Sequence, residues 1–200
     1  MRIRTFLVAA AMLLSACSGS PESEDAQPSA TPYRYAALAE MSREYVSASD
    51  GSISVLRPEG WLRTSDPAEA PSILLWLVND DYTASLSFVH MQMDPALYET
   101  LKKDGLEAVA KVSLGLKQRG ADDAVHLVQP VEQFRIGGRL CAAYEYRTGA
   151  AEALIRIVVF DTGSRFMECT LFPASSAITP AANRKLFELQ QSVLASLVVK

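Results

Sequence analysis

Short extended segments joined by tight turns occupy the second half of the chain, and they constrain its fold more than any other feature. Five such segments are predicted, at residues 124–128, 131–136, 139–147, 152–160 and 165–172. Turn residues such as Gly137-Gly138 and Thr148-Gly149 separate them. Because a parallel crossover needs about a dozen residues or more, connections this short make neighbouring strands antiparallel. The second half of the chain is therefore predicted to form an antiparallel sheet.

The first half of the chain adds further strands to this prediction. Extended segments are expected at 45–47 and 53–56, on either side of an Asp-Gly turn, and at 73–78 and 82–93. Residues 73–78 are apolar at successive positions, so we expect other parts of the structure to cover both faces of this strand. Residues 33–46 show only weak helical spacing and are interpreted as a lead-in segment.

Two helices are predicted beside the strands. Asp94 is a suitable N-cap, Pro95 suits the first turn, and apolar residues keep helical spacing from there to Gly120. A closing helix is predicted to begin at Thr179-Pro180. Since each helix has one apolar side to bury, we predict the fold class α+β, an antiparallel sheet sandwiched by helices.

The amino-terminal residues are typical of a targeting signal. Arg2 and Arg4 precede an apolar run at 6–14, which is shorter than the about 20 residues that a membrane-spanning helix needs. Leu14-Ser15-Ala16-Cys17 resembles the bacterial lipobox, in which the cysteine is lipidated and the preceding peptide is removed. We predict a signal peptide at 1–16 and a lipid anchor, palmitate included, on Cys17. The alternative is an ordinary cleaved signal with a coincidental cysteine.

A flexible tether is predicted between the lipid and the domain. Residues 18–32 contain no large apolar side chain and cannot offset the entropy cost of ordering. Together with Cys17 they form the tether 17–32, which would place the domain roughly 20 Å from the lipid on average. The remaining residues, 33–200, are predicted to form a single α+β domain.

Charge and the residue after the cysteine refine the expected location. Loss of Arg2 and Arg4 would take the formal net charge from −4 to −6, so the acyl chains rather than charge would hold the protein at the membrane. Ser18 follows Cys17, and by resemblance to sorting in double-membrane bacteria this favours the outer membrane, facing the periplasm. In a single-membrane source the protein would lie on the outer face of that membrane. With 19 basic and 23 acidic residues, the chain has no basic field to attract nucleic acid, which is excluded as a partner.

No catalytic or cofactor motif is found in the sequence. A nucleophilic serine needs a base within hydrogen-bonding reach, and both histidines, His90 and His126, fall on separate predicted strands. There is no G-x-S-x-G motif, no phosphate-binding glycine loop and no G-x-G-x-x-G before a helix. We therefore predict no catalytic residue, no metal and no cofactor; the alternative is an enzyme with an unrecognised site.

A periplasmic copper-binding protein is a further alternative. His90, Met91 and Met93 carry the imidazole and thioether groups that Cu(I) prefers. In a strand, however, His90 points to one face and both methionines to the other. Such a site would need a twisted strand end with Met41 or Met167 close by.

Two cysteines remain after the lipid site is assigned. Turn positions predict that Cys141 lies beside Val158 and that Val158 lies beside Met167, so that one strand separates Cys141 from Cys169. Two strand spacings are about 9.6 Å, which exceeds the roughly 7 Å between Cα atoms that a disulfide tolerates. We predict two buried free thiols.

Three aromatic residues are candidates for a partner or ligand surface: Trp61, Tyr144 and Tyr146. Trp61 follows a glycine at a strand exit, where it could lie over the mouth of a pocket. The alternative is that Trp61 closes the end of the sandwich and that both tyrosines pack beneath a helix with their hydroxyls at its rim.

The order of elements resembles the PsbP-like family, which includes the extrinsic lumenal protein of photosystem II and many bacterial lipoproteins. The resemblance covers about residues 45–199. It rests on Pro58-Glu59-Gly60-Trp61, on the Phe134-Arg135-Ile136-Gly137-Gly138 hairpin and on the following Ala143-Tyr144-Glu145-Tyr146 strand. It implies a sheet of six to seven strands between helices and a non-enzymatic binding or assembly role towards an envelope protein or a small ligand. It brings no catalytic residues.

Overall fold

The computed structural model describes residues 35–64, 71–120, 125–148, 153–174 and 178–200. The predicted signal peptide, Cys17 and the tether lie outside these residues. The strands are β1 (Met41–Ser47), β2 (Ile53–Pro58), β3 (Trp61–Thr64), β4 (Ile73–Asn79), β5 (Ala84–His90), β6 (Val125–Ile136), β7 (Arg139–Thr148), β8 (Leu154–Asp161), β9 (Phe166–Pro173) and β10 (Val198–Val199). The helices are α1 (Pro95–Asp104), α2 (Leu106–Gly120) and α3 (Pro180–Ala195).

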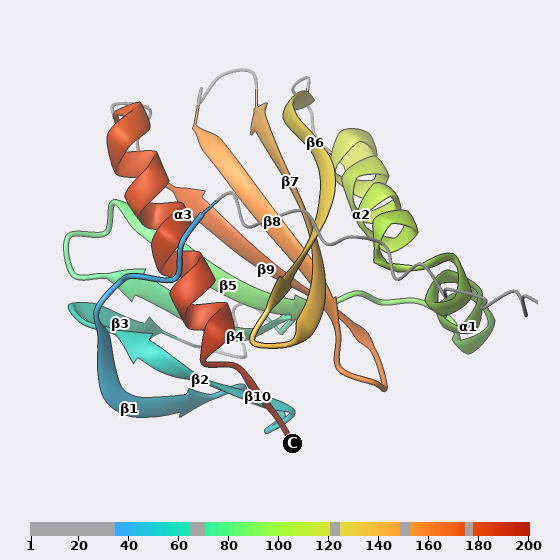
Figure 1. Cartoon of the computed structure of the whole chain (residues 1–200), viewed down its shortest axis with the longest axis horizontal. Helices are drawn as coiled ribbons and strands as arrows, with labels where there is room; N and C mark the ends of the chain where they lie inside the picture. Colours follow the sequence, from blue (N-terminus) through green and yellow to red (C-terminus); the bar gives the residue numbers. More distant parts are fainter. Residues whose placement is uncertain (1–34, 65–70, 121–124, 149–152, 175–177) are drawn as a thin grey trace, which may run out of the picture.

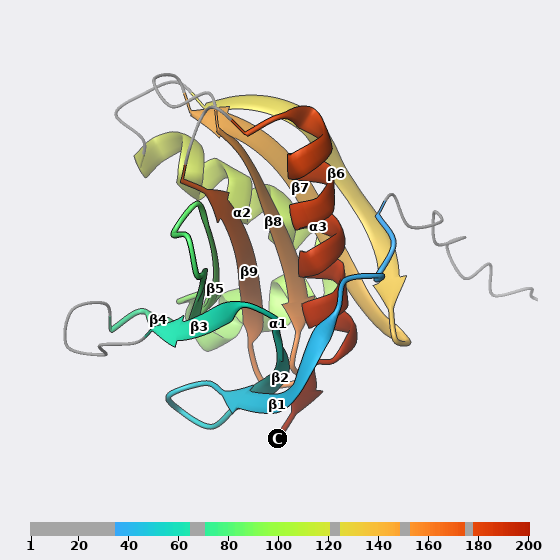
Figure 2. The same cartoon turned by 90° about the vertical axis from the view of Figure 1, so that its left-hand side faces the viewer.

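One seven-stranded antiparallel sheet forms the centre of the molecule, in the order β3-β4-β5-β9-β8-β7-β6. Helix α3 crosses one face, and α2 lies on the opposite face, as two perpendicular views show (Figures 1 and 2). A smaller sheet, β1-β2-β10, packs with α3 on the same side. The α+β sandwich and the seven strands are as predicted.

The sheet has an apolar core on each face. Beneath α3, side chains from both sheets and the helix form one cluster that includes Ile53, Leu75, Phe88 and Phe187. Beneath α1 and α2, a second cluster contains Tyr144, Ile157 and Val109. The alternation of strand side chains explains this division, because neighbouring residues such as Ile157 and Val158 point to opposite faces.

The helix predicted from Asp94 to Gly120 is two helices. Asp94 caps α1 as expected, since its side chain accepts a hydrogen bond from the Leu97 amide at 2.8 Å. The helix ends at Gly105, whose φ of 85° and ψ of 168° are not helical. Apolar residues in α1 and α2 both contact the same core, so the spacing by itself did not reveal the break.

The segments 124–128 and 131–136 were predicted as separate strands, but residues 125–136 form the single strand β6. Its pairing with β7 shifts register twice, between Leu127 and Gln129 and between Gln129 and Glu132. Pro130 lies in this irregular part, on an edge strand where a missing N–H group is tolerated.

The lead-in segment differs from the expectation. Residues 35–40 have no regular structure, and Met41–Ser47 is strand β1 rather than part of a weak helix. Pairing with β2 explains the strand, because Val46 lies opposite Val55 with both side chains buried. The short strands β3 and β10 were not predicted at all.

The cysteines lie in a register two residues away from the predicted one. Cys141 is opposite Phe160, and Val158 is opposite Cys169. The β8–β9 turn explains part of this shift, because Asp161 pairs with Phe166 and the Thr162 amide donates to the Arg165 carbonyl at 3.0 Å. Strand β8 still separates Cys141 from Cys169, and both are free and buried, as predicted.

Candidate functional site

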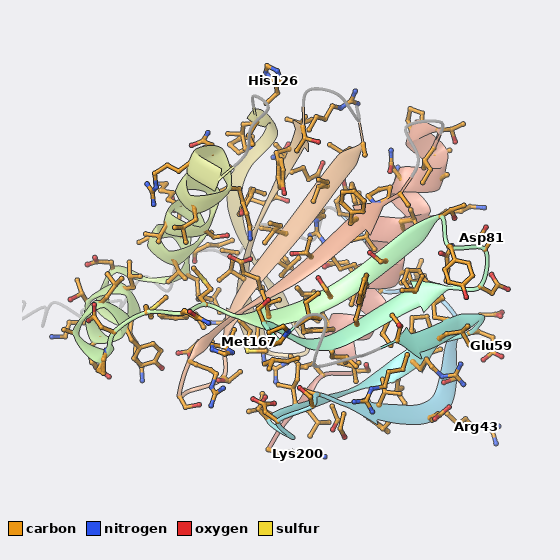
Figure 3. The ribbon with its side chains drawn as sticks, turned by 180° about the vertical axis from the view of Figure 1, so that it is seen from behind. Arg43, Glu59, Asp81, His126, Met167 and Lys200 are labelled. Carbon is orange, nitrogen blue, oxygen red and sulfur yellow. The ribbon has the colours of Figure 1, made fainter. Side chains whose placement is uncertain are left out.

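Strands β3, β4 and β5 and one end of β9 are left uncovered on the α2 side of the main sheet. Helix α2 packs over β6, β7 and β8, and no described helix lies over β3, β4 and β5 on this face (Figure 3). Register defines two rows of residues that point outward: Thr64, Trp76, Ser87 and Thr170, and beside them Leu62, Val78, Ser85 and Phe172. The first row continues through Ile157 to Tyr144, which are buried beneath α2. These eight residues are called the open face below.

The open face combines four apolar or aromatic side chains with four that carry a hydroxyl group. Leu62 is 50 % exposed, Phe172 is 40 % exposed, and Trp76 and Val78 are half-buried. Together with Tyr82 at the β4–β5 turn, they line a groove of about 550 Å³. Binding pockets of small ligands have volumes in this range and a similar excess of apolar lining.

The open face also corrects the prediction that β4 is covered on both sides. Leu75 and Leu77 are fully buried in the core beneath α3, whereas Trp76 and Val78 point to the other face and remain half-buried. Solvated faces of antiparallel strands usually carry polar side chains. The sequence showed that residues 73–78 are apolar on both faces of the strand, but it did not show that one of these faces has no covering helix among the described residues.

A hydrogen-bonded turn presents Tyr82 at one end of the open face. The Asp81 carboxylate accepts hydrogen bonds from the Thr83 hydroxyl at 2.6 Å and the Thr83 amide at 3.0 Å, which lower the pKa of Asp81. Asp81 lies where β4 and β5 meet (Figure 3). Tyr82 has a φ of 58°, which is rare outside glycine, and its side chain is 71 % exposed. The turn thus holds an aromatic side chain in solvent at a cost in backbone strain.

The predicted aromatic candidates are buried and do not form this surface. Trp61 is 4 % exposed and belongs to the core beneath α3. Tyr144 is fully buried, Tyr146 is 7 % exposed, and their rings lie 6.0 Å apart beneath α2. Both tyrosines pack beneath a helix, as in the alternative interpretation, but the Tyr144 hydroxyl meets Ser113 in the interior rather than lying at the rim.

Titratable side chains do meet beneath α2, in one hydrogen-bonded set. The Ser113 hydroxyl donates to the Glu168 carboxylate at 2.7 Å and lies 2.6 Å from the Tyr144 hydroxyl. Lys117, one turn further along α2, donates to the other Glu168 oxygen at 2.8 Å. Burial raises the pKa of Tyr144 above its ordinary value. Because Ser113 is fully buried and both of its contacts are internal, the set docks α2 on the sheet and the Ser113 hydroxyl is not accessible to a substrate.

A second buried polar set lies on the α3 side. Arg156 is 1 % exposed and donates from Nη1 to the side-chain oxygens of Gln190 and Gln191 at 2.9 and 3.2 Å. Its Nε lies 3.9 Å from the Glu145 carboxylate, which accepts a hydrogen bond from the Tyr35 hydroxyl at 2.7 Å. Burial lowers the pKa of Arg156. These contacts attach α3 and the entering chain to the sheet, in a place that solvent does not reach.

The residues of the copper alternative surround the end of β5. His90, Met91 and Met93 contribute to the walls of a cavity of about 460 Å³. His90 is paired with Met167, which belongs to the core beneath α3, whereas Met91 and Met93 pack in the core beneath α1 and α2. His126 lies on β6, and three strands, β9, β8 and β7, separate β6 from β5 in the sheet (Figure 3). Within the described ranges, no three His, Cys, Asp or Glu side chains form a group that could hold a metal ion.

The described helices are all too short or too polar to cross a bilayer. This finding concerns only residues 35–64, 71–120, 125–148, 153–174 and 178–200.

Comparison with solved structures places this arrangement in a known fold. The solution structure of cyanobacterial PsbP (CyanoP) from Synechocystis sp. PCC 6803 is similar over 78 % of this chain and 92 % of that one, with a TM-score of 0.57 and 16 % identity. A variant of the protein Mog1 is similar over 80 % of this chain and 96 % of that one, with a TM-score of 0.50 and 12 % identity. The crystal structure of LpqN, described as involved in cell envelope biogenesis of Mycobacterium tuberculosis, is similar over 78 % of this chain and 90 % of that one. Its identity is 12 % and its TM-score is 0.42.

No protein family and no curated protein matches the sequence. The domain nevertheless has the PsbP-like fold that the order of its elements predicted.

Proposed function

We propose that this protein is a non-catalytic accessory protein of the bacterial envelope, held at a membrane by lipid on Cys17. Its PsbP-like domain binds a partner through the open face. The observation that carries this proposal is the uncovered half of the main sheet, where Trp76, Val78 and Phe172 point outward. Exposed apolar patches of this kind mark interaction sites in soluble domains.

The polar sets of the domain support a binding role rather than catalysis. Catalysis needs an accessible nucleophile, acid or base beside a substrate cavity. Ser113, Glu168 and Arg156 are buried, and their side chains are hydrogen-bonded to other side chains of the interior. The described residues that line the groove of the open face, by contrast, have apolar or hydroxyl side chains, with Arg63 as the one charged residue among them.

Photocrosslinking in cells tests the role of the open face. A photoreactive amino acid at position 172 should give a reproducible crosslinked product, because Phe172 points outward on β9, within the open face, and is 40 % exposed. The matched control is position 127, since Leu127 is 44 % exposed on β6 at the other edge of the sheet. Equal labelling from both positions, together with measurable turnover of an envelope metabolite, would contradict the proposal.

Fractionation tests the anchor separately. The unaltered protein should sediment with membranes, whereas Cys17→Ala should not be lipidated and should lose the membrane-bound fraction. Cys141→Ala is the matched control, because Cys141 is buried in the sheet and should leave the fractionation unchanged. Mass spectrometry of the amino-terminal peptide would identify the acyl chains; an unmodified Cys17 would rule out the anchor.

A further inference from the structure

The cavity at the end of β5 is a second candidate binding site, separate from the open face. Its volume of about 460 Å³ is within the range of sites for small ligands. Three segments form its walls: the β5–α1 connection, the start of α1 and the β8–β9 turn. These segments meet at one end of the sheet (Figures 1 and 3). This space is called the strand-end cavity below.

We propose that the strand-end cavity binds a small organic anion that has a carboxylate at one end and an apolar body. Arg165 holds the carboxylate, and the apolar wall of the cavity holds the body. The proposal goes beyond the proposed function, because the strand-end cavity and the groove of the open face have no lining residue in common.

Arg165 provides the positive charge of the site. Its Nη1 donates to the Asp50 carboxylate at 3.2 Å, and its side chain is 42 % exposed. Its Nε and Nη2 form no hydrogen bond with any described residue. A guanidinium group carries five N–H donors in a planar fork that matches the two oxygens of a carboxylate. Asp50 therefore holds Arg165 through one nitrogen, and donors on the other two remain for a ligand.

Two more polar side chains of the walls have no hydrogen-bonding role in the described fold. His90 has a buried Nδ1 without a partner among the described residues. The Gln92 side chain also forms no hydrogen bond with these residues, and Gln92 is exposed. Buried polar atoms without a partner are rare in native proteins, and each one calls for an explanation. A ligand with hydrogen-bonding groups would give both side chains a partner.

The strand register brings these polar groups to one place. The pairing of β5 with β9 reaches His90. The Met91 amide then donates to the Phe166 carbonyl at 2.9 Å, which extends the pairing by one residue. The next position along this series sets Gln92 opposite Arg165. All three polar side chains, those of His90, Gln92 and Arg165, accordingly line the strand-end cavity.

The rest of the wall is mostly apolar. Met91 and Phe166 are buried in the core beneath α1 and α2, and Met93 packs against this core. The ring of Tyr98 lies 4.9 Å from the ring of Phe166, measured between their centres. An apolar wall beside a few polar groups suits a ligand with a hydrophobic body and one charged end. Inorganic anions have no such body and would leave this wall uncovered.

The carboxylates beside the cavity do not all oppose an anion. Asp94 caps α1, and Asp161 accepts a hydrogen bond from the Gly163 amide at 2.8 Å, so both are engaged by backbone donors. Asp50 is different, because its partner is Arg165 itself. A bound carboxylate would therefore share Arg165 with Asp50, and the two negative charges would repel each other.

Nuclear magnetic resonance of the histidine rings tests the site, since the chain contains two histidines. The sample is the chain from residue 17 onward with Cys17→Ser, which keeps every described residue. Benzoate should shift the His90 signals in a saturable way, with a dissociation constant of about 0.1–10 mM. The His126 signals should not move, because β6 is at the far edge of the sheet. His126→Gln assigns the two sets.

Two further probes define the class of ligand. Benzamide has the body of benzoate without its charge, and inorganic phosphate has a charge without the body. Each should bind at least about tenfold more weakly than benzoate, since each lacks one of the two interactions. Benzamide or phosphate that binds as tightly as benzoate would contradict the proposed class.

Three substitutions test the role of Arg165. Arg165→Gln should reduce the preference for benzoate over benzamide to less than about twofold. The matched control is Arg184→Gln, which changes an exposed arginine of α3 and should keep the preference. Asp50→Asn should strengthen benzoate binding about two- to fivefold, because the competing charge is removed. If Arg165 only held the turn in place, loss of Asp50 would weaken binding instead. Circular dichroism checks that each variant is folded.

Several outcomes would overturn the proposal. They are the absence of a saturable shift at His90, equal shifts of both histidines, an unchanged benzoate preference in Arg165→Gln, and weaker benzoate binding in Asp50→Asn. None of these results bears on crosslinking from position 172. Failure of the anion site therefore leaves the proposed function standing, and loss of crosslinking leaves the anion site standing.

Discussion

At the scale of single residues, the most demanding feature of the fold is the buried guanidinium group of Arg156, which aromatic rings surround. Arg156 lies 4.9 Å from the Tyr35 ring centre, 5.4 Å from that of Phe134 and 5.9 Å from that of Phe187. Moving a charge out of water costs several kcal/mol, so its partners must compensate. Glu145, two glutamines and the ring faces provide that compensation and tie α3 to the sheet.

A double-mutant cycle should show that Arg156 and Glu145 depend on each other. Arg156→Met and Glu145→Gln should each lower the free energy of unfolding by about 3–5 kcal/mol, because each leaves a buried charge without its partner. The double variant should lose less than the sum of both changes. Urea denaturation gives these values.

The exposed pair Arg184 and Glu188 is the control for this cycle. The Arg184 Nε lies 3.3 Å from the Glu188 Oε1 on the surface of α3, and the Arg184 side chain is 69 % exposed. Arg184→Met should change stability by less than about 1 kcal/mol. Strict additivity of Arg156→Met and Glu145→Gln would show that the buried contact is not a coupled pair.

The buried thiols predict a loss of stability in alkaline solution. Burial raises the pKa of Cys141 and of Cys169 from 9.0 to about 12. As pH rises above 9, thiols of the unfolded chain lose their protons while those of the folded chain keep them, so the unfolded state is favoured. The free energy of unfolding should therefore fall between about pH 9 and pH 12. Denaturation of Cys169→Ala across this range should show a shallower fall; an identical slope would contradict the cause.

At the scale of elements, Gly105 decides that residues 95–120 form two helices. Its amide donates to the Leu101 carbonyl at 3.0 Å and ends α1, and its positive φ turns the chain into α2. A side chain is disfavoured in that conformation. The α1–α2 angle therefore depends on a single residue that the helical spacing did not distinguish from its neighbours.

Two glycine substitutions in this hairpin should have opposite effects. Gly105→Ala should lower the free energy of unfolding by about 1–3 kcal/mol, because alanine is strained at a φ of 85°. Gly115→Ala should raise it by about 0.5–1 kcal/mol, since Gly115 lies inside α2 and its new Cβ would meet only the Arg119 side chain, at 3.6 Å. Thermal or urea denaturation measures both. A Gly105→Ala variant that is at least as stable as the unaltered chain would show that Gly105 is not a required break.

At the scale of the whole molecule, the two cores share one sheet. Residues of β7, β8 and β9 contribute alternately to the core beneath α3 and to the core beneath α2. Neither core can be lost without exposing side chains of the same strands. The domain is therefore expected to unfold as one cooperative unit.

The two tryptophans allow this expectation to be measured. Trp61 lies in the core beneath α3 and Trp76 on the open face, and the chain has no other tryptophan. In Trp61→Phe, fluorescence of Trp76 should give the same urea midpoint as far-ultraviolet circular dichroism. Near-ultraviolet dichroism, which senses the tyrosines beneath α2, should also coincide. A separate, earlier transition in the last signal would mean that α1 and α2 detach independently.

The sequence by itself determined the local and periodic features of this protein. Short turns made the strands antiparallel, Asp94 and Thr179 began helices as predicted, and the order of elements indicated the PsbP-like fold. Such features depend on residues that are close together in the chain, so they can be predicted from the sequence without knowledge of the tertiary contacts. The same reasoning predicted that Cys141 and Cys169 are free and buried, although the strand register differed by two residues.

Only the tertiary structure decided what covers each face. Trp61, Tyr144 and Tyr146 were candidate surface residues and are buried, whereas Trp76 was expected to be covered and lies on the open face. The pattern of side chains along a strand shows whether each of its two faces is apolar. It does not show which helix, if any, packs on each face. Burial depends on elements that are distant in the sequence, and here α2 extends over β8 without covering β4.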